Sequence, residues 1–197
     1  MPTSRLDAQL RFIREVDRLK SVLRRSQLMD ESRRENSAEH SWHIALMAVV
    51  MAEHADTPVD VLHVVKMLLI HDIVEIDAGD TYAYDMDGRQ DQHEREAVAA
   101  RRIFGLLPAD QSEEFYALWE EFEAKASPEA RLANAVDRLM PLMHNVANRG
   151  ETWQAHGVTR PAVEARMAPI AAGSSALWDV AVALMDDAVA KGYLAAE

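Results

Sequence analysis

Apolar residues recur at three- and four-residue spacings along almost the whole chain, and this periodicity constrains the fold more than any other feature. In the first segment the apolar residues fall on one helical stripe, which contains Leu6, Leu10, Ile13, Val16, Leu19 and Leu23. Only 7 glycines and 7 prolines interrupt the 197 residues, and few stretches alternate apolar and polar side chains as half-buried strands do. The sequence therefore predicts an all-α protein.

Capping residues and prolines divide the pattern into separate helices. Ser37 is the predicted N-cap of a helix that stops before Asp56. Thr57, with Pro58 at the first helical position, is the predicted start of the next helix, which is apolar on nearly all sides and therefore central. Residues 79–90, with two glycines, three aspartates and no helical period, are a predicted loop. The central helix spans about 59–76, and the other predicted helices span about 5–25, 91–106, 112–125, 128–148 and 161–190.

Length and composition favour one domain that needs no covalent cross-link. The chain is a little longer than the commonest domain size, and hydrophobic residues make up 49% of it. It contains no cysteine, which excludes disulfide scaffolds and thiolate zinc sites. Because no repeat, low-complexity tract or linker interrupts it, we expect a single domain over residues 1–197.

The net charge limits the partners that this chain can bind. With 21 basic and 33 acidic side chains the formal charge is −12, so broad electrostatic binding to nucleic acid or to an anionic membrane is excluded. The longest apolar run, 59–70, is too short to span a bilayer, and the charged N-terminus lacks a signal-peptide pattern. We expect a cytoplasmic protein with no nucleic-acid or membrane partner, in which local charges meet any phosphate-bearing ligand.

A set of histidines and carboxylates has the composition of a metal site: His40, His71, Asp72, Glu75, Asp80 and Asp137. His71 and Glu75 are four residues apart and share a helix face, with Asp72 about 100° around the helix. Imidazole suits first-row transition metals and carboxylate suits harder ions, so one divalent ion (Mn, Co, Mg, Zn, Fe or Ni) is the predicted cofactor. An isolated His-Asp pair at a helix end is more often a cap or a solvated surface. Here the pair lies in the most apolar helix, where an ionised carboxylate needs a partner.

Three motifs in order resemble the HD-domain metal-dependent phosphohydrolases. They are Arg34-Glu35-Asn36-Ser37-Ala38-Glu39-His40-Ser41, then His71-Asp72-Ile73-Val74-Glu75 followed by Gly79-Asp80-Thr81, and Asp137 in a late helix. Within that superfamily the chain is similar to the 5′-deoxynucleotidase branch over about residues 10–142, including the LWEEFE stretch at 118–123. The resemblance implies a compact helical bundle with its metal-binding core in that range. Helices of about 160–190 would pack on the core or form an interface.

The resemblance also implies a role for each residue of the metal site. His40, His71, Asp72 and Asp137 are the implied metal ligands. Glu75 is implied to act on the attacking water, which makes Glu75 and Asp72 the predicted catalytic residues. This assignment goes beyond what the spacing alone indicates.

For the substrate, the resemblance implies contacts with Thr81 and with an arginine near the end of the first predicted helix. It implies that Asp80 contacts either the sugar or a water held near the metal. Arg25 aligns with the arginine that meets the phosphate, and Arg24 is a competitor one residue away. In the bacterial enzyme of this branch a tryptophan follows the arginine, whereas this chain has Ser26.

Three neighbours of these residues have two interpretations each. Glu39 either contacts the ligand His40 from behind or simply favours the dipole of its helix. His43 either faces the same pocket or packs at the surface. His144, seven residues after Asp137 on the same predicted helix, either lines the far side of the pocket or has a structural role, which is the commoner case.

These observations together predict a metal-dependent phosphomonoester hydrolase, a 5′-nucleotidase that acts on deoxyribonucleoside 5′-monophosphates. Its predicted partner is a small nucleotide substrate. Two alternatives remain: an HD-type hydrolase of cyclic nucleotides, guanosine polyphosphates or dNTPs, and a non-catalytic sensor that binds metal and nucleotide. The resemblance further implies a homodimer. The apolar residues of the C-terminal helices are predicted core or interface, among them Ile170, Leu177, Trp178, Val180 and Leu184.

Overall fold

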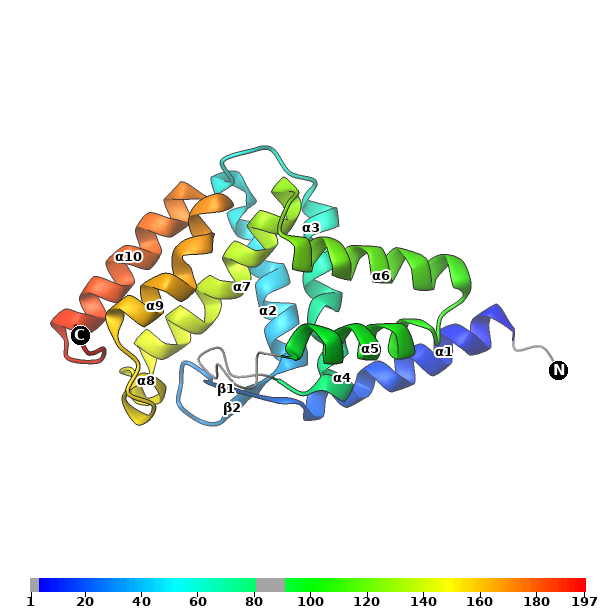
Figure 1. Ribbon diagram of the computed structural model, residues 1–197, viewed down its shortest axis with the longest axis horizontal. Coiled ribbons are helices and arrows are strands. Elements are labelled where there is room, and N and C mark those ends of the chain that lie inside the picture. The colour runs from blue at the N-terminus through cyan, green and yellow to red at the C-terminus, as the bar shows by residue number, and fades with distance from the viewer. Residues whose placement is uncertain (1–3, 81–90) are drawn as a thin grey trace.

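The computed structural model describes residues 4–80 and 91–197, and helices make up most of that part of the chain (Figure 1). The α-helices are α1 (Arg5–Val16), α2 (Ser37–Met51), α3 (Val61–Ile70), α4 (Glu75–Ala78), α5 (Gln92–Phe104), α6 (Ala109–Ala124), α7 (Pro128–Ala147), α8 (Glu151–Ala155), α9 (Arg160–Met167) and α10 (Ser175–Ala190). Four 3-10 helices join them: η1 (Asp17–Ser21), η2 (Ala52–His54), η3 (His71–Val74) and η4 (Ala168–Ala172). The predicted all-α class is confirmed.

A two-stranded hairpin is the part of the fold that the periodicity missed. Strand β1 (Leu23–Gln27) pairs antiparallel with β2 (Arg34–Asn36), with an irregularity in register along β1. The prediction of one helix over 5–25 is therefore wrong after residue 16, where a 3-10 turn and then strand β1 follow α1. Both strands are short and mostly polar, so they lack the alternating apolar pattern that identifies a strand.

The starts of two helices also differ from the prediction. The N-cap of α2 is Asn36 and not Ser37, because the Asn36 side chain accepts a hydrogen bond from the backbone N–H of Glu39. Helix α3 begins at Val61, where the carboxylate of Asp60 caps it, and not at the Thr57-Pro58 pair. In both places a side-chain acceptor one residue before the helix satisfies the free backbone N–H groups.

Two predicted helices are divided into shorter pieces. The segment predicted as a helix over 59–76 tightens into η3 after Ile70, so that His71 and Asp72 lie in a 3-10 turn. The segment predicted over 161–190 is broken at Gly173, where a Cβ atom would lie only 2.5 Å from the carbonyl oxygen of Arg131. That close backbone approach requires glycine and explains the break between η4 and α10.

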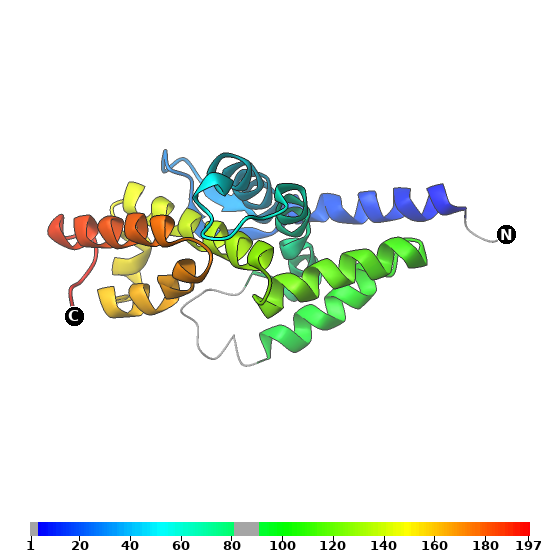
Figure 2. The same ribbon diagram turned by 90° about the horizontal axis from the view of Figure 1, so that it is seen from above.

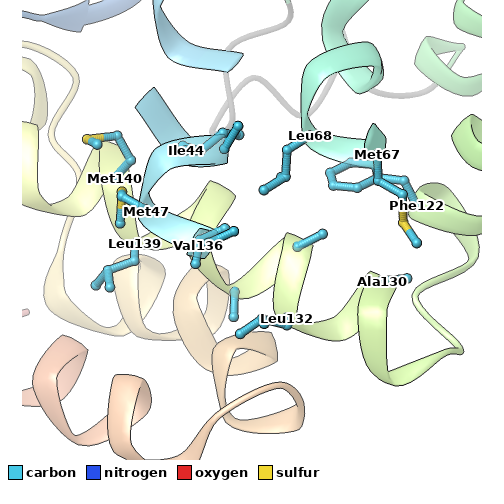
Figure 3. Close-up of a cluster of buried hydrophobic side chains, with 14 of the residues drawn as sticks. Ile44, Met47, Met67, Leu68, Phe122, Ala130, Leu132, Val136, Leu139 and Met140 are labelled. Carbon is cyan, nitrogen blue, oxygen red and sulfur yellow. The ribbon is translucent and has the colours of Figure 1, made fainter. Parts of the chain in front are cut away.

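The hydrophobic core lies where α2, α3 and α7 meet (Figure 3). Each helix contributes fully buried side chains, namely Ile44 and Ala48 from α2, Met67 and Leu68 from α3, and Leu132, Val136 and Met140 from α7. The aromatic ring of Phe122 from α6 closes one side of this cluster. The same helices also bury polar side chains, and buried polar groups need hydrogen-bond or metal partners.

The remaining helices lie on two sides of this centre. Helices α1, α5 and α6 extend to one side of α7, and α8, α9 and α10 lie on the other (Figures 1 and 2). Of the C-terminal residues predicted as core or interface, Ile170 and Leu177 are buried, whereas Val180 is 47% exposed. No helix in the described ranges is long and apolar enough to cross a membrane.

Two glycines with similar backbone conformation allow a controlled test of the packing between α8 and the C-terminal segment. Gly150 has φ +71°, and a Cβ atom there would lie 2.0 Å from the carbonyl oxygen of Tyr193. Gly157 has φ +60° and nothing within 4 Å of that position. We expect the free energy of unfolding to fall by about 1–2 kcal/mol in both alanine variants, because a residue with a Cβ atom is strained in the left-handed conformation. Gly150→Ala should lose more stability, because the backbone at Tyr193 must also move. Thermal unfolding measures the difference, and equal shifts of Tm would contradict this account.

Candidate metal centre and active site

Three elements that are distant in sequence bring the four predicted metal ligands together. His40 lies in the first turn of α2, His71 and Asp72 lie in η3, and Asp137 lies in the middle of α7. Nε2 of His40 is 3.0 Å from Oδ1 of Asp137. Nε2 of His71 is 2.9 Å from Oδ1 of Asp72 and 3.7 Å from the same Asp137 oxygen. The four side chains therefore face a common point.

The chemistry of this cluster fits a divalent ion. One ligand atom each from His40, His71 and Asp72 lies within 4.8 Å of the others, and all three residues are buried. Nδ1 of His71 is 2.9 Å from the carbonyl oxygen of Leu68, an acceptor that requires Nδ1 to carry the proton. Nε2 of His71 is buried and has no hydrogen-bond partner among the described residues, so its lone pair can bind a metal.

The electrostatics of the cluster also favour a bound cation. Burial opposes ionisation of Asp137, but the neighbouring imidazoles of His40 and His71 hold its pKa well below the ordinary value. Burial likewise opposes the charge on His71, yet the neighbouring Asp72 and Asp137 carboxylates raise its pKa well above the ordinary value. The cluster thus attracts a proton when no metal is bound, and metal binding must displace that proton.

Glu75 lies beside the ligands at the first residue of α4. Its side chain is buried, and its Oε2 atom accepts a hydrogen bond of 2.6 Å from the hydroxyl group of Ser37. Burial and the adjacent Asp72 carboxylate raise the pKa of Glu75 well above its ordinary value. The pKa of the half-buried Asp80 is raised chiefly by burial. Carboxyl groups with raised pKa values next to a set of metal-binding side chains are typical of acid–base catalysis.

The adjacent arginines of β1 have different surroundings. Arg24 is mostly buried, and its Nη1 atom donates a 2.8 Å hydrogen bond to Oδ2 of Asp72. Arg25 is exposed and forms no ion pair with the described residues. Arg24 therefore neutralises one of the predicted ligands, while the guanidinium of Arg25 remains available to an anion.

A cavity of about 320 Å³ connects these groups. Its lining includes the predicted residues Arg24, Arg25, His71, Asp72, Glu75, Asp80 and Asp137. The same lining contains Ser26 and, from the C-terminal half, Asn145, Trp153 and Arg166. That volume is at the lower end of the range for pockets that hold small molecules.

Two residues predicted to lie near the site, Glu39 and His43, are not among the residues that line this cavity. Glu39 accepts hydrogen bonds from Arg33 and from the backbone N–H of Asn36, so it caps its helix. These contacts favour the interpretation that Glu39 stabilises the start of its helix. One of the ring nitrogens of His43 lies within 4.8 Å of ligand atoms of Glu35 and His144. Thr81 lies outside the described residues.

Sequence reasoning assigned no role to Glu35, although this residue is only 1% exposed and lies 3.4 Å from His40. The signal was present, because Glu35 opens the E-N-x-x-E-H motif in which His40 is the last residue. His144, for which a structural role was the commoner expectation, is buried 3.8 Å from the same glutamate. Neither contact follows from local spacing.

Known proteins have sequences similar to about two thirds of this chain. Human 5′-deoxynucleotidase HDDC2 is 34% identical over 130 residues, which are 66% of this chain and 62% of the human protein. The zebrafish (Danio rerio) protein of the same name is 33% identical over 135 residues, 68% of this chain and 66% of the relative. The chain thus spans somewhat less than two thirds of the length of these relatives.

A solved structure is similar over nearly the full length. The crystal structure of a protein described as a "predicted metal-dependent phosphohydrolase", from Magnetospirillum magnetotacticum, has a TM-score of 0.94 and 55% identity, with 99% of this chain and 98% of that chain covered. The sequence model of the HD domain family matches residues 16–178. This match covers well over half of the chain and includes His40, His71, Asp72 and Asp137. The protein therefore belongs to the HD domain family.

Proposed function

We propose that this protein is a metal-dependent phosphomonoester hydrolase, a 5′-nucleotidase for deoxyribonucleoside 5′-monophosphates. The observation that carries the proposal is the convergence of His71, Asp72 and Asp137 with the protonatable Glu75 and the exposed Arg25 on one cavity. The human and zebrafish relatives are named 5′-deoxynucleotidases, which supports the substrate class. The cavity volume suits a small nucleotide better than a polymer.

In this proposal His40, His71, Asp72 and Asp137 hold one divalent ion. Two imidazole nitrogens and two carboxylate groups without a thiolate accept Mn, Co, Fe, Ni, Zn or Mg. When bound there, the ion would lower the pKa of a coordinated water and neutralise phosphoryl oxygens. Arg24 keeps Asp72 ionised and oriented through the 2.8 Å hydrogen bond to Oδ2, which leaves Oδ1 on the side of His71.

Glu75 is the proposed proton acceptor. Its Oε2 atom is held by the hydroxyl group of Ser37, so Oε1 is the oxygen free to take a proton from the attacking water. Because its pKa is raised well above the ordinary value, the same carboxyl group can return the proton to the leaving alcohol. A carboxylate with an ordinary pKa would be the weaker base of the two.

Arg25, Asp80 and Thr81 are the proposed substrate contacts. The exposed guanidinium of Arg25 can hold a phosphate with two parallel hydrogen bonds. Asp80 lines the same cavity and can accept a hydrogen bond from a sugar hydroxyl group. The side chain of Ser26 is too small to stack on a base, so the base must be bound by other residues of the cavity.

Phosphate release from a nucleotide panel tests the proposed function. After metal is removed from the full chain, we expect release from deoxyribonucleoside 5′-monophosphates only when Mn, Co, Mg or Zn is added back. No release from these substrates by a metal-loaded protein would contradict the proposal. In that case, turnover of cyclic nucleotides, guanosine polyphosphates or dNTPs would identify another phosphohydrolase, and binding without turnover would identify a sensor.

We also propose that the chain is one domain and forms a homodimer. Residues from β1 to α9 line one cavity, which supports a single domain. Apolar side chains on one face of α2 are exposed: Trp42, Leu46, Val49 and Val50. Val50 also lines an apolar groove of about 660 Å³, together with Val180 and Leu184 of α10. A second copy of the chain would cover this surface, and a monomeric mass in sedimentation experiments would contradict the dimer.

A further inference from the structure

Four buried polar atoms that have no hydrogen-bond partner among the described residues lie close together, next to the predicted metal ligands His40 and Asp72. They are Oε2 of Glu35, Nδ1 of His40, Nε of Arg24 and Nδ1 of His144. The three nitrogens lie 3.4, 3.6 and 3.8 Å from the single Glu35 oxygen, for His40, Arg24 and His144 respectively. Such atoms are rare in folded proteins because each one costs free energy, so this group requires an explanation.

The hydrogen-bonding capacities of these groups are complementary. The guanidinium of Arg24 only donates, an ionised carboxylate only accepts, and an imidazole nitrogen can carry the donated proton. Each separation exceeds an ordinary N–H···O distance of about 2.7–3.2 Å by less than an ångström. A small movement of the Glu35 carboxylate would therefore satisfy at least two of the donors at once.

Glu35 lies where it can orient two of the proposed metal ligands, His40 and Asp72. The Nδ1 atom of His71 has the Leu68 carbonyl as its acceptor. The corresponding atom of His40 has no hydrogen-bond partner among the described residues and lies 3.4 Å from the Glu35 carboxylate. A proton held on Nδ1 of His40 by Glu35 leaves the lone pair on Nε2, the nitrogen that faces Asp137. Through Arg24, Glu35 is also linked to the ligand Asp72.

We propose that Glu35 is a positioning residue of the metal site. It accepts the Nδ1 proton of His40 and the Nε proton of Arg24, and thereby sets the tautomer of one metal ligand and the orientation of another. This inference rests on the metal ligands of the proposed function. It assigns a role to a glutamate that does not line the cavity and does not touch the substrate.

A second metal ion is the rival explanation, because ligand atoms of Glu35, His43 and His144 also lie within 4.8 Å of one another. Two observations favour hydrogen bonding. The permanent positive charge of Arg24 is 3.6 Å from the same Glu35 oxygen and would repel a cation there. An ion on Glu35 would also leave Nδ1 of His40 and Nε of Arg24 without an acceptor, whereas the hydrogen-bonded arrangement uses both.

Metal affinity of the full chain, measured with Mn²⁺ or Co²⁺ alone in competition with a chelator, tests the inference without any nucleotide. We expect Glu35→Gln to weaken binding about 10- to 100-fold, the usual effect of losing a partner that orients a metal-bound histidine. The absorption bands of bound Co²⁺ should shift as well. The matched control is Glu121→Gln, which removes the carboxylate from a 2.8 Å contact with His63 away from the site and should leave the affinity unchanged.

If Glu35→Gln does not fold, Glu35→Asp keeps the charge opposite Arg24 but withdraws the carboxylate from His40, and the same loss is expected. Unchanged affinity and an unchanged Co²⁺ spectrum in the folded variant would overturn the inference. So would a second equivalent of metal in the wild-type protein that is lost in His144→Ala. If His71→Ala also left the metal affinity unchanged, the proposed metal ligands themselves would be wrong. If His71→Ala lost metal affinity and Glu35→Gln did not, only the role of Glu35 would be overturned.

Discussion

His71→Ala is expected to remove both the bound metal and the phosphate release, with kcat/KM at least about 10³-fold lower. The reason is the position of Nε2, which has no hydrogen-bond partner in the described structure and faces both the Asp72 and the Asp137 carboxylates. A bound ion contributes several kcal/mol to stabilisation of the transition state, and each 1.36 kcal/mol corresponds to about a factor of ten in rate.

The matched control for this variant is His63→Ala. His63 lies on α3, the helix that ends directly before His71. Its side chain is partly exposed and contacts Glu121. We expect the control to keep its metal content, measured by elemental analysis, and its rate of phosphate release. A His71→Ala protein that still bound one equivalent of metal and released phosphate at the wild-type rate would show that the ion is held elsewhere.

Glu75→Gln is expected to separate catalysis from metal binding. Because Glu75 is the proposed proton acceptor and is not a proposed ligand, kcat should fall by about 10²- to 10⁴-fold, the usual contribution of acid–base catalysis. Metal affinity should remain close to that of the wild-type protein. Loss of metal together with activity would mean that Glu75 is a ligand, and unchanged kcat would exclude it from proton transfer.

The same variant should be more stable than the wild-type protein when both are free of metal. Burial, followed by the neighbouring Asp72 carboxylate, raises the pKa of Glu75 well above its ordinary value of 4.5, so the folded protein holds this proton more tightly than the unfolded chain does. The wild-type protein therefore loses stability as the pH rises from the ordinary value through the raised pKa of the folded state. Glutamine carries no titrating proton and avoids this loss.

Thermal unfolding of the two metal-free proteins at a series of pH values measures this effect. We expect the Tm difference between Glu75→Gln and wild type to be small in acid and to grow in favour of the variant as the pH rises. For a chain of this size each kcal/mol shifts Tm by about 2–4 °C. The exposed Glu114→Gln, which removes a surface ion pair with Lys66, should show no such trend. A Tm difference that did not change with pH would contradict a raised pKa.

The sequence was sufficient for features that depend on local order along the chain. Helices α2, α3, α5, α6 and α7 follow the 3.6-residue period of their apolar side chains, because that period is a property of the helix itself. The proposed metal ligands were identified because a few side chains with unusual chemistry follow one another in order: His40, then His71-Asp72, then Asp137. The hairpin was missed for the opposite reason: strands of five and three residues are stabilised by pairing with each other and not by a pattern of their own.

Tertiary structure decided which of several chemically equivalent residues take each position. Arg24 and Arg25 are identical in type and adjacent in sequence, yet only the fold places Arg24 against Asp72 and leaves Arg25 open to the cavity. Glu35 and His144 are 109 residues apart and meet only because β2 and α7 both pack against α2. The apolar pattern determines which side of each helix is buried, but the contacts between buried polar groups depend on how those helices are packed, and no local pattern encodes that arrangement.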